Sequence, residues 1–482
     1  MNFRHFLFFL FLFVVCTLIA ADNKPIDIGT RLEPLVDDYL IDSMQNLELM
    51  LHHPERRQVV FAADAAWEDS VAAFIRVLED SGVVRLYYRA GMTGEGENRK
   101  PIMAMATSSD GGYSFQRPIL NLTEFEGSSE NNILAIGGAP TIPPPFIDSH
   151  PECPPDQRYK GLSASWQKIY AMCSADGLRW RLMHSDSLAM DGTFDTINTA
   201  FWDEKIGKYH CFTRYMENLT EESDEEDVLG AHPTVVRAIQ SSTSNDFINW
   251  SPVVHHTYVD GEDEWQLYTN ATLPCPGAEH IYLSFPNRYV QHRVVDPGRK
   301  YPGVNDALFM TSRDGVHWHR FLQAWVRPGP DPYNWTDRNN YVTWGLIQSP
   351  DEWSMYISEH YRREGVPPRL RRLAIRPHGF VSLHADWENG KATTLPLRFS
   401  GNRLRINFST SAAGWIKVAI LDGSGSAIPG YGVDDMTPIF GDELERTVTW
   451  DRGYDLTPLV GQTLRLQFIL KDADLYAIQF SL

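Results

Sequence analysis

The chain has 482 residues, of which 62 are acidic and 43 are lysine or arginine, and its formal net charge is −19. This charge argues against nucleic acid and anionic membrane surfaces as partners, because both attract clustered positive charge. The length exceeds what one ordinary core can bury and predicts a large repeat domain together with a second domain.

Residues 1–21 have the pattern of a secretory signal peptide. Arg4 and His5 precede an apolar run over 6–19, and the small residues Ala20 and Ala21 follow it. The run is short for a membrane span, and no later stretch is long and apolar enough to be one. We therefore expect an exported protein, secreted or periplasmic, without membrane contact once the signal is removed.

The cysteines and the acidic run between residues 217 and 227 do not indicate a cofactor. Four cysteines follow the signal, at scattered positions without CxxC or histidine pairing, so neither a metal site nor a cofactor is predicted. Disulfides and free thiols both remain open. The acidic run is typical of a solvated loop, with a calcium site as the alternative.

A short phrase of the form Ser-x-Asp-Gly, with Phe replacing Gly in one copy, recurs four times and leads each time to an aromatic residue. Its aspartates, 66, 70 and 68 residues apart, are Asp110, Asp176, Asp246 and Asp314. A fixed period of this size indicates repeated supersecondary units. Strand-like runs flank each phrase, so the phrase itself predicts a hairpin turn. We expect the aspartates to accept hydrogen bonds from turn amides rather than to act in catalysis.

Each repeat contains two strand-like runs upstream of its hairpin, which gives four strands in a meander. A fifth unit lacks the aspartate phrase, but Pro377-His378-Gly379 places a turn before Phe380 to Leu383. Five four-stranded meanders predict a five-bladed β-propeller over residues 22–385. The segment Arg31 to Asp42 is expected to add a strand that closes the ring.

The sequence pattern changes at about Asp386. Short alternating strands separated by Gly, Asp and Ser fill residues 386–482, and the aspartate phrase no longer occurs. This pattern predicts a separate C-terminal β-sandwich. The expected fold class is therefore all-β, a five-bladed propeller followed by a sandwich.

Propeller geometry predicts which residues meet at one mouth of the central channel. The start of the first strand and the end of the second lie at the same mouth, whereas the aspartate hairpins lie at the opposite face. Carboxylates and amides precede the first strands: Glu68, Asp69, Glu130, Asn131, Asn132, Asp195, Glu262, Asp263, Glu264 and Asp337. Other polar residues end the second strands: Arg89, Arg214, Arg288, Glu359 and His360.

Acids that converge on one mouth can supply the proton donor and the base or nucleophile that break a glycosidic bond. We predict Asp69 as nucleophile or base, Glu359 as general acid and Asp195 as a transition-state stabiliser or pKa modulator. The predicted substrate-binding residues are Arg89, Glu130, Asn131, Arg214, Arg288, Trp344 and His360. Guanidinium groups suit the recognition of carboxylate or sulfate, although local pairing with the acids is an equal alternative.

Five blades, the repeated Ser-x-Asp-Gly-x-x-Trp hairpin and a trailing sandwich resemble the furanosidase superfamily of glycoside hydrolases, families 32, 43 and 68, and most closely the layout of family 32. The family 32 motifs Trp-Met-Asn-Asp-Pro-Asn, Arg-Asp-Pro and Glu-Cys are absent, and Asp69 in Trp67-Glu68-Asp69-Ser70 is the nearest positional match to the nucleophile. Hydrolysis of sucrose or fructan therefore does not carry over.

Sialidases offer a second comparison, because Arg89, Arg214 and Arg288 are similar to an arginine triad, but five repeats count against their usual six blades. The leading hypothesis is an exported glycoside hydrolase-like protein that acts on an acidic or sulfated glycan. The rivals are a non-catalytic carbohydrate-binding propeller and a scaffold for protein partners. No feature of the sequence determines the oligomeric state.

Overall fold

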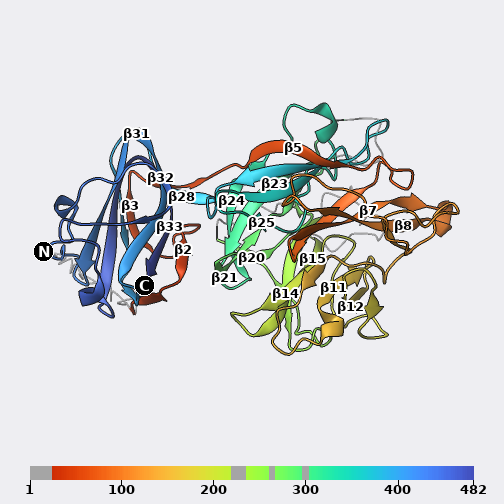
Figure 1. Cartoon of the computed structure of the whole chain (residues 1–482), viewed down its shortest axis with the longest axis horizontal. Coiled ribbons are helices and arrows are strands. Elements are labelled where there is room, and N and C mark those ends of the chain that lie inside the picture. The colour runs from red at the N-terminus through yellow and green to blue at the C-terminus, as the bar shows by residue number, and fades with distance from the viewer. Residues whose placement is uncertain (1–23, 219–234, 260–265, 296–302) are drawn as a thin grey trace, which may run out of the picture.

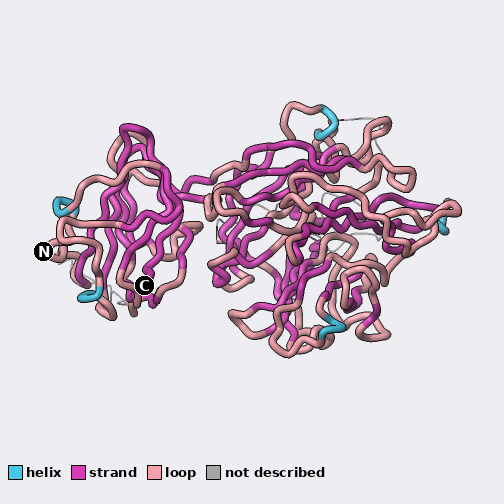
Figure 2. The backbone as a smooth tube through the Cα atoms, viewed as in Figure 1, coloured by secondary structure: helices cyan, strands magenta, loops and turns pink. Residues whose placement is uncertain are grey.

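A computed structural model describes residues 24–218, 235–259, 266–295 and 303–482. The predicted signal, most of the acidic run and the carboxylates at 262–264 lie outside these residues. The described residues form an all-β structure in two lobes, with helical segments limited to short 3-10 turns (Figures 1 and 2). The 3-10 turns are Gly96–Asn98, Pro155–Gln157, Pro332–Asn334, Val433–Asp435 and Thr457–Leu459.

Five sheets form the larger lobe; they are antiparallel except for one short parallel pair in the fourth, and the first three are four-stranded meanders. Blade 1 contains β6 (Ala73–Asp80), β7 (Val83–Thr93), β8 (Lys100–Ser108) and β9 (Ile133–Ile136). Blade 2 contains β10 (Pro145–Ile147), β11 (Tyr159–Ala164), β12 (Ile169–Ser174) and β13 (Arg181–Leu182). Blade 3 contains β14 (Thr199–Asp203), β15 (Lys208–Asn218), β16 (Val235–Ser244) and β17 (Val254–His255).

Blade 4 carries additional short strands. Its main strands are β20 (Leu273–Cys275), β21 (Ala278–Ser284), β23 (Val304–Ser312) and β24 (His317–Val326). The additional strands are β18 (Thr257–Tyr258), β19 (Gln266–Leu267) and β22 (Asn287–Val290). Blade 5 contains β25 (Ile347–Gln348), β26 (Trp353–Glu359), β27 (Arg369–Ile375) and β5 (Glu55–Ala62).

The innermost strands surround one central channel. A cavity of 260 Å³ toward the ends of these strands receives side chains from all five blades, among them Arg76, Phe146, Phe201, Leu273 and Leu346. Continuous runs of buried residues, as in β26 and the middle of β8, build the lobe, because each blade buries side chains on both faces against its neighbours. The five-bladed propeller is therefore confirmed.

The strand that closes the ring differs from the one predicted. β5 pairs antiparallel with β27, so an N-terminal strand completes the last blade. The expected closing segment 31–42 instead contributes β2 (Leu32–Pro34), which pairs with the C-terminal strand β33 (Leu464–Ser481). The prediction for 31–42 is therefore wrong. Its apolar residues Leu35 and Leu40 are buried in the core of the smaller lobe, which is what draws this segment away from the ring.

The smaller lobe is one ten-stranded mixed sheet that surrounds its own apolar core. It combines N-terminal strands, namely β1 (Ile26–Gly29), β2, β3 (Ile41–Gln45) and β4 (Glu48–Leu51), with C-terminal ones. The C-terminal strands are β28 (Val381–Ala385), β29 (Gly390–Thr394), β30 (Leu397–Phe399), β31 (Arg403–Asp422), β32 (Asp442–Thr447) and β33. The segment 381–385, expected in the fifth blade, therefore pairs in this lobe.

Candidate functional site at the propeller mouth

Loops from neighbouring blades meet where the first strands begin and the second strands end. The backbone N–H of Arg362 donates to the carbonyl of Ser70 at 2.6 Å, which joins blade 5 to blade 1. The hydroxyl of Thr196 donates to the carbonyl of Tyr268 at 3.1 Å and so joins blade 3 to blade 4. These hydrogen bonds join the mouth loops in pairs, blade 5 to blade 1 and blade 3 to blade 4.

Asp69 keeps partial exposure at the blade 1 sector of the mouth. Its carboxylate accepts hydrogen bonds from the backbone N–H groups of Val71 at 2.8 Å and Met92 at 3.0 Å. A β carbon on Gly91 would lie 3.0 Å from the Asp69 carboxyl carbon, so the close approach of this strand fixes the position of the acid. The side chain of the neighbouring Glu68 is fully buried and forms an ion pair with Arg117 at 2.6 Å.

Glu130 and Asn131 lie in the loop before β9, and they differ in role. Asn131 is 4% exposed, and its side chain bonds the backbone of Thr123, Ser128 and Ile133. Its polar atoms therefore hold the loop itself. Glu130 is exposed to solvent at the end of the same turn.

Asp195 and Arg214, predicted from separate positions of the third repeat, form an ion pair in the structure. Asp195 has a 40% exposed side chain, whereas Arg214 is 2% exposed. Only one guanidinium nitrogen of Arg214 contacts the acid, and its Nε and Nη1 are buried without a hydrogen-bond partner. The Arg214 guanidinium also lies 5.0 Å from the centre of the Tyr268 ring.

Arg237 lies near the same aromatic ring as Arg214, that of Tyr268, and was not predicted from the sequence. Its guanidinium is 5.2 Å from the centre of Tyr268 and donates to the side chain of Gln266, while its Nε is buried without a partner. Arg237 follows the start of the third strand, which returns to the same mouth as the end of the second. Inspection of third-strand starts would have found it.

Tyr361 was also missed, although it directly follows the predicted pair Glu359 and His360. It is 7% exposed, and its hydroxyl accepts a hydrogen bond from Arg89 at 2.7 Å. Burial raises the pKa of the Tyr361 phenol, but the charges of Arg89, Arg362 and Arg338 outweigh this effect, and the net pKa is lowered. Arg89 also donates to the carbonyl of Val71.

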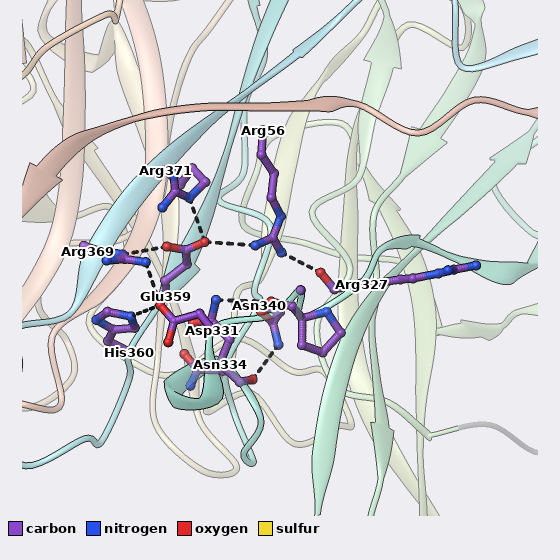
Figure 3. A network of polar contacts seen from close by, with 12 residues as sticks. Arg56, Arg327, Asp331, Asn334, Asn340, Glu359, His360, Arg369 and Arg371 are labelled. Carbon is purple, nitrogen blue, oxygen red and sulfur yellow. Dashed lines mark hydrogen bonds and ion pairs between the residues drawn. The ribbon is translucent and has the colours of Figure 1, made fainter.

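Glu359 occupies a crowded cationic environment (Figure 3). The carboxylate is fully buried and accepts hydrogen bonds from Arg56 at 3.3 Å, Arg369 at 2.6 Å and Arg371 at 2.8 Å. Burial raises the pKa of Glu359, but the bonds and charges of Arg371 and Arg369 more than offset this and lower it. An anion held by three guanidinium groups is a poor proton donor.

The remaining predicted binding residues are bound within the protein. His360 contacts Asp331 at 2.8 Å in the network around Glu359 (Figure 3). Arg288 makes a bidentate pair with Asp306 at 2.8 and 2.6 Å. Trp344 is 2% exposed, lies 4.1 Å from the guanidinium of Arg76, and lines the channel cavity rather than the mouth.

In the part of the chain that the structure describes, no three His, Cys, Asp or Glu side chains are grouped to hold a metal ion. No helix among the same residues is long and apolar enough to cross a membrane. The cysteines Cys153, Cys173, Cys211 and Cys275 are free thiols.

Comparisons with known proteins found similarity at the level of solved structures. No protein-family model and no curated protein sequence matches the chain. A protein described as a glycoside hydrolase has a TM-score of 0.40 at 13% identity, over 70% of this chain and 95% of its own. A glycoside hydrolase of family 130 that targets β-1,2-mannosidic linkages in Candida mannan has a TM-score of 0.39 at 14% identity, over 73% of this chain and 97% of its own.

A β-1,3-galactosidase of family 43, solved with galactodeoxynojirimycin, has a TM-score of 0.39 at 10% identity, over 66% of this chain and 95% of its own. These likenesses are too distant to transfer any residue role.

Proposed function

We propose that this is an exported, glycoside hydrolase-like protein that binds and cleaves an acidic or sulfated glycan at the propeller mouth. The observation that carries the proposal is Arg214, which is 2% exposed and has two guanidinium nitrogens, Nε and Nη1, without a hydrogen-bond partner. A buried donor that makes no hydrogen bond is costly, and a charged one more so. A carboxylate or sulfate from a ligand would satisfy these donors with charge-assisted bonds.

The surroundings of Arg214 suit a charged sugar. Arg237 adds a second buried guanidinium, and Tyr268 offers an aromatic ring that both arginines approach within 5.2 Å. Aromatic rings are suited to packing against the apolar faces of sugars, while the arginines fix the anionic substituent. The protein has a net charge of −19, so this cluster of arginines is a local positive site in a negatively charged molecule. Such a site attracts anions selectively.

Hydrolysis within this proposal would draw on Asp69 and Asp195, the predicted acids that keep solvent exposure. Glu359 is not part of this proposal as the proton donor, because its carboxylate already accepts hydrogen bonds from three arginines. The alternative function, carbohydrate binding without catalysis, is favoured by one observation: Asp195 is paired with Arg214. In that reading the same arginines bind the glycan.

The test is isothermal titration of the purified protein with three sets of oligosaccharides, uronic, sulfated and neutral. We expect Arg214→Gln to weaken binding of the charged set by about 10- to 100-fold, since a charge-assisted bond to a buried site is lost. Arg288→Gln is the matched control, because Arg288 is already paired with Asp306. Equal affinity of wild type and Arg214→Gln for every charged glycan would contradict the proposal.

A further inference from the structure

The acids of the mouth are engaged as hydrogen-bond acceptors. Asp69 accepts from two backbone amides, Asp195 pairs with Arg214, and Glu359 accepts from three guanidinium groups. Hydrolysis by a carboxyl pair needs one acid that carries a proton and gives it to the departing oxygen. All three carboxylates already accept bonds within the protein, and Tyr361, whose hydroxyl accepts from Arg89, is a further titratable side chain at the mouth.

Tyr361 is the phenol best placed to exchange a proton. Its hydroxyl accepts from Arg89 at 2.7 Å, and the Arg362 guanidinium lies 5.3 Å from the ring centre. Arg338 adds a third positive charge, and Asp337 contacts both Arg338 at 3.4 Å and Arg362 at 3.7 Å. Cationic neighbours stabilise a phenolate, so the side chain is prepared to act as a base.

The anion site and this phenol share a neighbour. Arg214 lies 5.0 Å and Arg338 lies 5.9 Å from the centre of the Tyr268 ring. An arc of side chains therefore runs from the buried donors of Arg214, past Tyr268 and Arg338, to Tyr361. This arc combines a site for a carboxylate with a group that can remove a proton.

We propose that the mouth cleaves a uronic-acid glycan by β-elimination, with Tyr361 as the proton-transferring group and Arg214 and Arg237 holding the uronate carboxylate. The inference rests on the proposed binding of an acidic glycan and replaces the carboxyl pair as the means of cleavage. Elimination requires a uronate, because only there does the proton at C5 lie next to a carboxylate that arginines can neutralise.

The step balances without an added reactant. The phenolate of Tyr361 takes the proton from C5, the electron pair of that bond forms the C4–C5 double bond, and the bond from C4 to the glycosidic oxygen breaks. When the proton and the oxygen lie on the same face of the sugar, Tyr361 returns the proton to the departing oxygen. The phenolate is regenerated, and water is not consumed.

The experiment incubates the whole protein with polygalacturonate, alginate and unsulfated chondroitin in ¹⁸O-labelled water. We expect an ultraviolet absorbing C4–C5 double bond in the products of at least one polymer, and no label at the newly formed ends. Tyr361→Phe should lower kcat by about 100-fold or more while the affinity in isothermal titration is kept. Arg89→Gln should move the pH of half-maximal activity upward, because the phenolate loses its hydrogen-bond donor.

Tyr356→Phe is the matched control for the fold of blade 5, since Tyr356 is buried and donates to the carbonyl of Gly112 away from the mouth. Its activity should equal that of wild type. Saturated, ¹⁸O-labelled products would overturn elimination and leave the proposed function standing. Binding of acidic glycans without cleavage would overturn every catalytic assignment, and absence of all glycan binding would overturn the proposed function as well.

Discussion

Charged side chains at the mouth differ in how completely their hydrogen bonds are made inside the protein. Glu359 receives three guanidinium groups and is fully buried, whereas Arg214 is buried with two donors unmet. The first arrangement satisfies the buried carboxylate, and the second leaves buried donors without an acceptor, which is the basis of the proposed anion site. Glu359 and Arg214 were both predicted from their residue type and their position in the repeat. Only their hydrogen-bond partners in the structure distinguish the two.

The Glu359 network gives a stability prediction. Glu359→Gln should lower the free energy of unfolding by about 3 kcal/mol, because three buried or half-buried arginines lose their shared counter-ion. Glu55→Gln is the control, since Glu55 pairs with Arg57 through a side chain that is 70% exposed and should contribute little. Urea unfolding of both variants measures the difference. Equal midpoints for Glu359→Gln and wild type would show that the network adds no stability.

The sequence indicated part of the candidate site. Repeat phase brought Asp195 and Arg214 into one sector, and the structure joins them as an ion pair. Arg237 was not predicted because it follows the start of a third strand. Tyr361 was not predicted because it follows the more conspicuous pair Glu359 and His360. Glu359 accepts hydrogen bonds from arginines of β5 and β27, and these two strands come together only when the ring closes. A local sequence pattern does not show that closure.

At the scale of elements, the aspartate phrases serve as turns that dock blades together. Asp176 accepts from the backbone N–H groups of Leu178 and Arg179, and the same bonding pattern occurs at Asp246 and Asp314. The turn after Asp176 reaches the neighbouring blade, where Tyr87 donates to the carbonyl of Gly177 at 3.2 Å. The hydrogen bonds confirm the structural role predicted for the phrase.

Strand β5 is the element on which closure of the propeller depends, and substitutions of its buried and exposed residues should differ in how much stability they cost. Phe61 is 5% exposed and packs edge-on against Phe74 and Tyr88. We expect Phe61→Ala to cost about 3 to 5 kcal/mol because it leaves a cavity between blades 5 and 1.

Val59 provides the control on the same strand, since it is 38% exposed. Val59→Ala should change the free energy of unfolding by less than about 1 kcal/mol. Chemical unfolding, followed by tryptophan fluorescence, distinguishes the two. A similar loss in both variants would mean that β5 is not held by the packing of its inner face.

For the whole molecule, N-terminal residues of the smaller lobe hold it against blade 4. Glu33, fully buried in β2, contacts His280 at 3.2 Å and Arg313 at 3.1 Å. Arg313 also binds Asp37 at 2.7 Å. The C-terminal side adds a second connection, in which Arg376 bonds Asn407 at 2.7 Å and the Phe408 carbonyl at 3.0 Å. The two lobes are therefore joined by charged contacts from both ends of the chain.

Glu33 gives these contacts a pH dependence. Burial raises its pKa, but the contact with His280 and the charge of Arg313 outweigh burial and lower the pKa from 4.5 to about 2. The unfolded chain therefore binds this proton at a higher pH than the folded protein does. The stability that Glu33 contributes, about 3 kcal/mol, is present above pH 4.5 and is lost as the pH falls toward 2.

Unfolding free energies measured across that window check the prediction. Wild type should be more stable than Glu33→Gln at neutral pH, and the difference should shrink on acidification. The control is Glu445→Gln, which removes a carboxylate with a 69% exposed side chain. Its unfolding free energy should change with pH in the same way as that of wild type. A constant difference between Glu33→Gln and wild type would exclude a role for this proton.

The sequence by itself determined the repeat, the number of blades and the structural turns, because each of these follows from local hydrogen bonding and alternating burial within about 70 residues. Tertiary structure decided which strand closes the ring, which lobe receives the N-terminus and which arginines meet which acids. These outcomes depend on contacts between residues hundreds of positions apart, such as Arg56 with Glu359. Pairing of that kind is selected by the global burial of charge and apolar surface, which local sequence patterns do not encode.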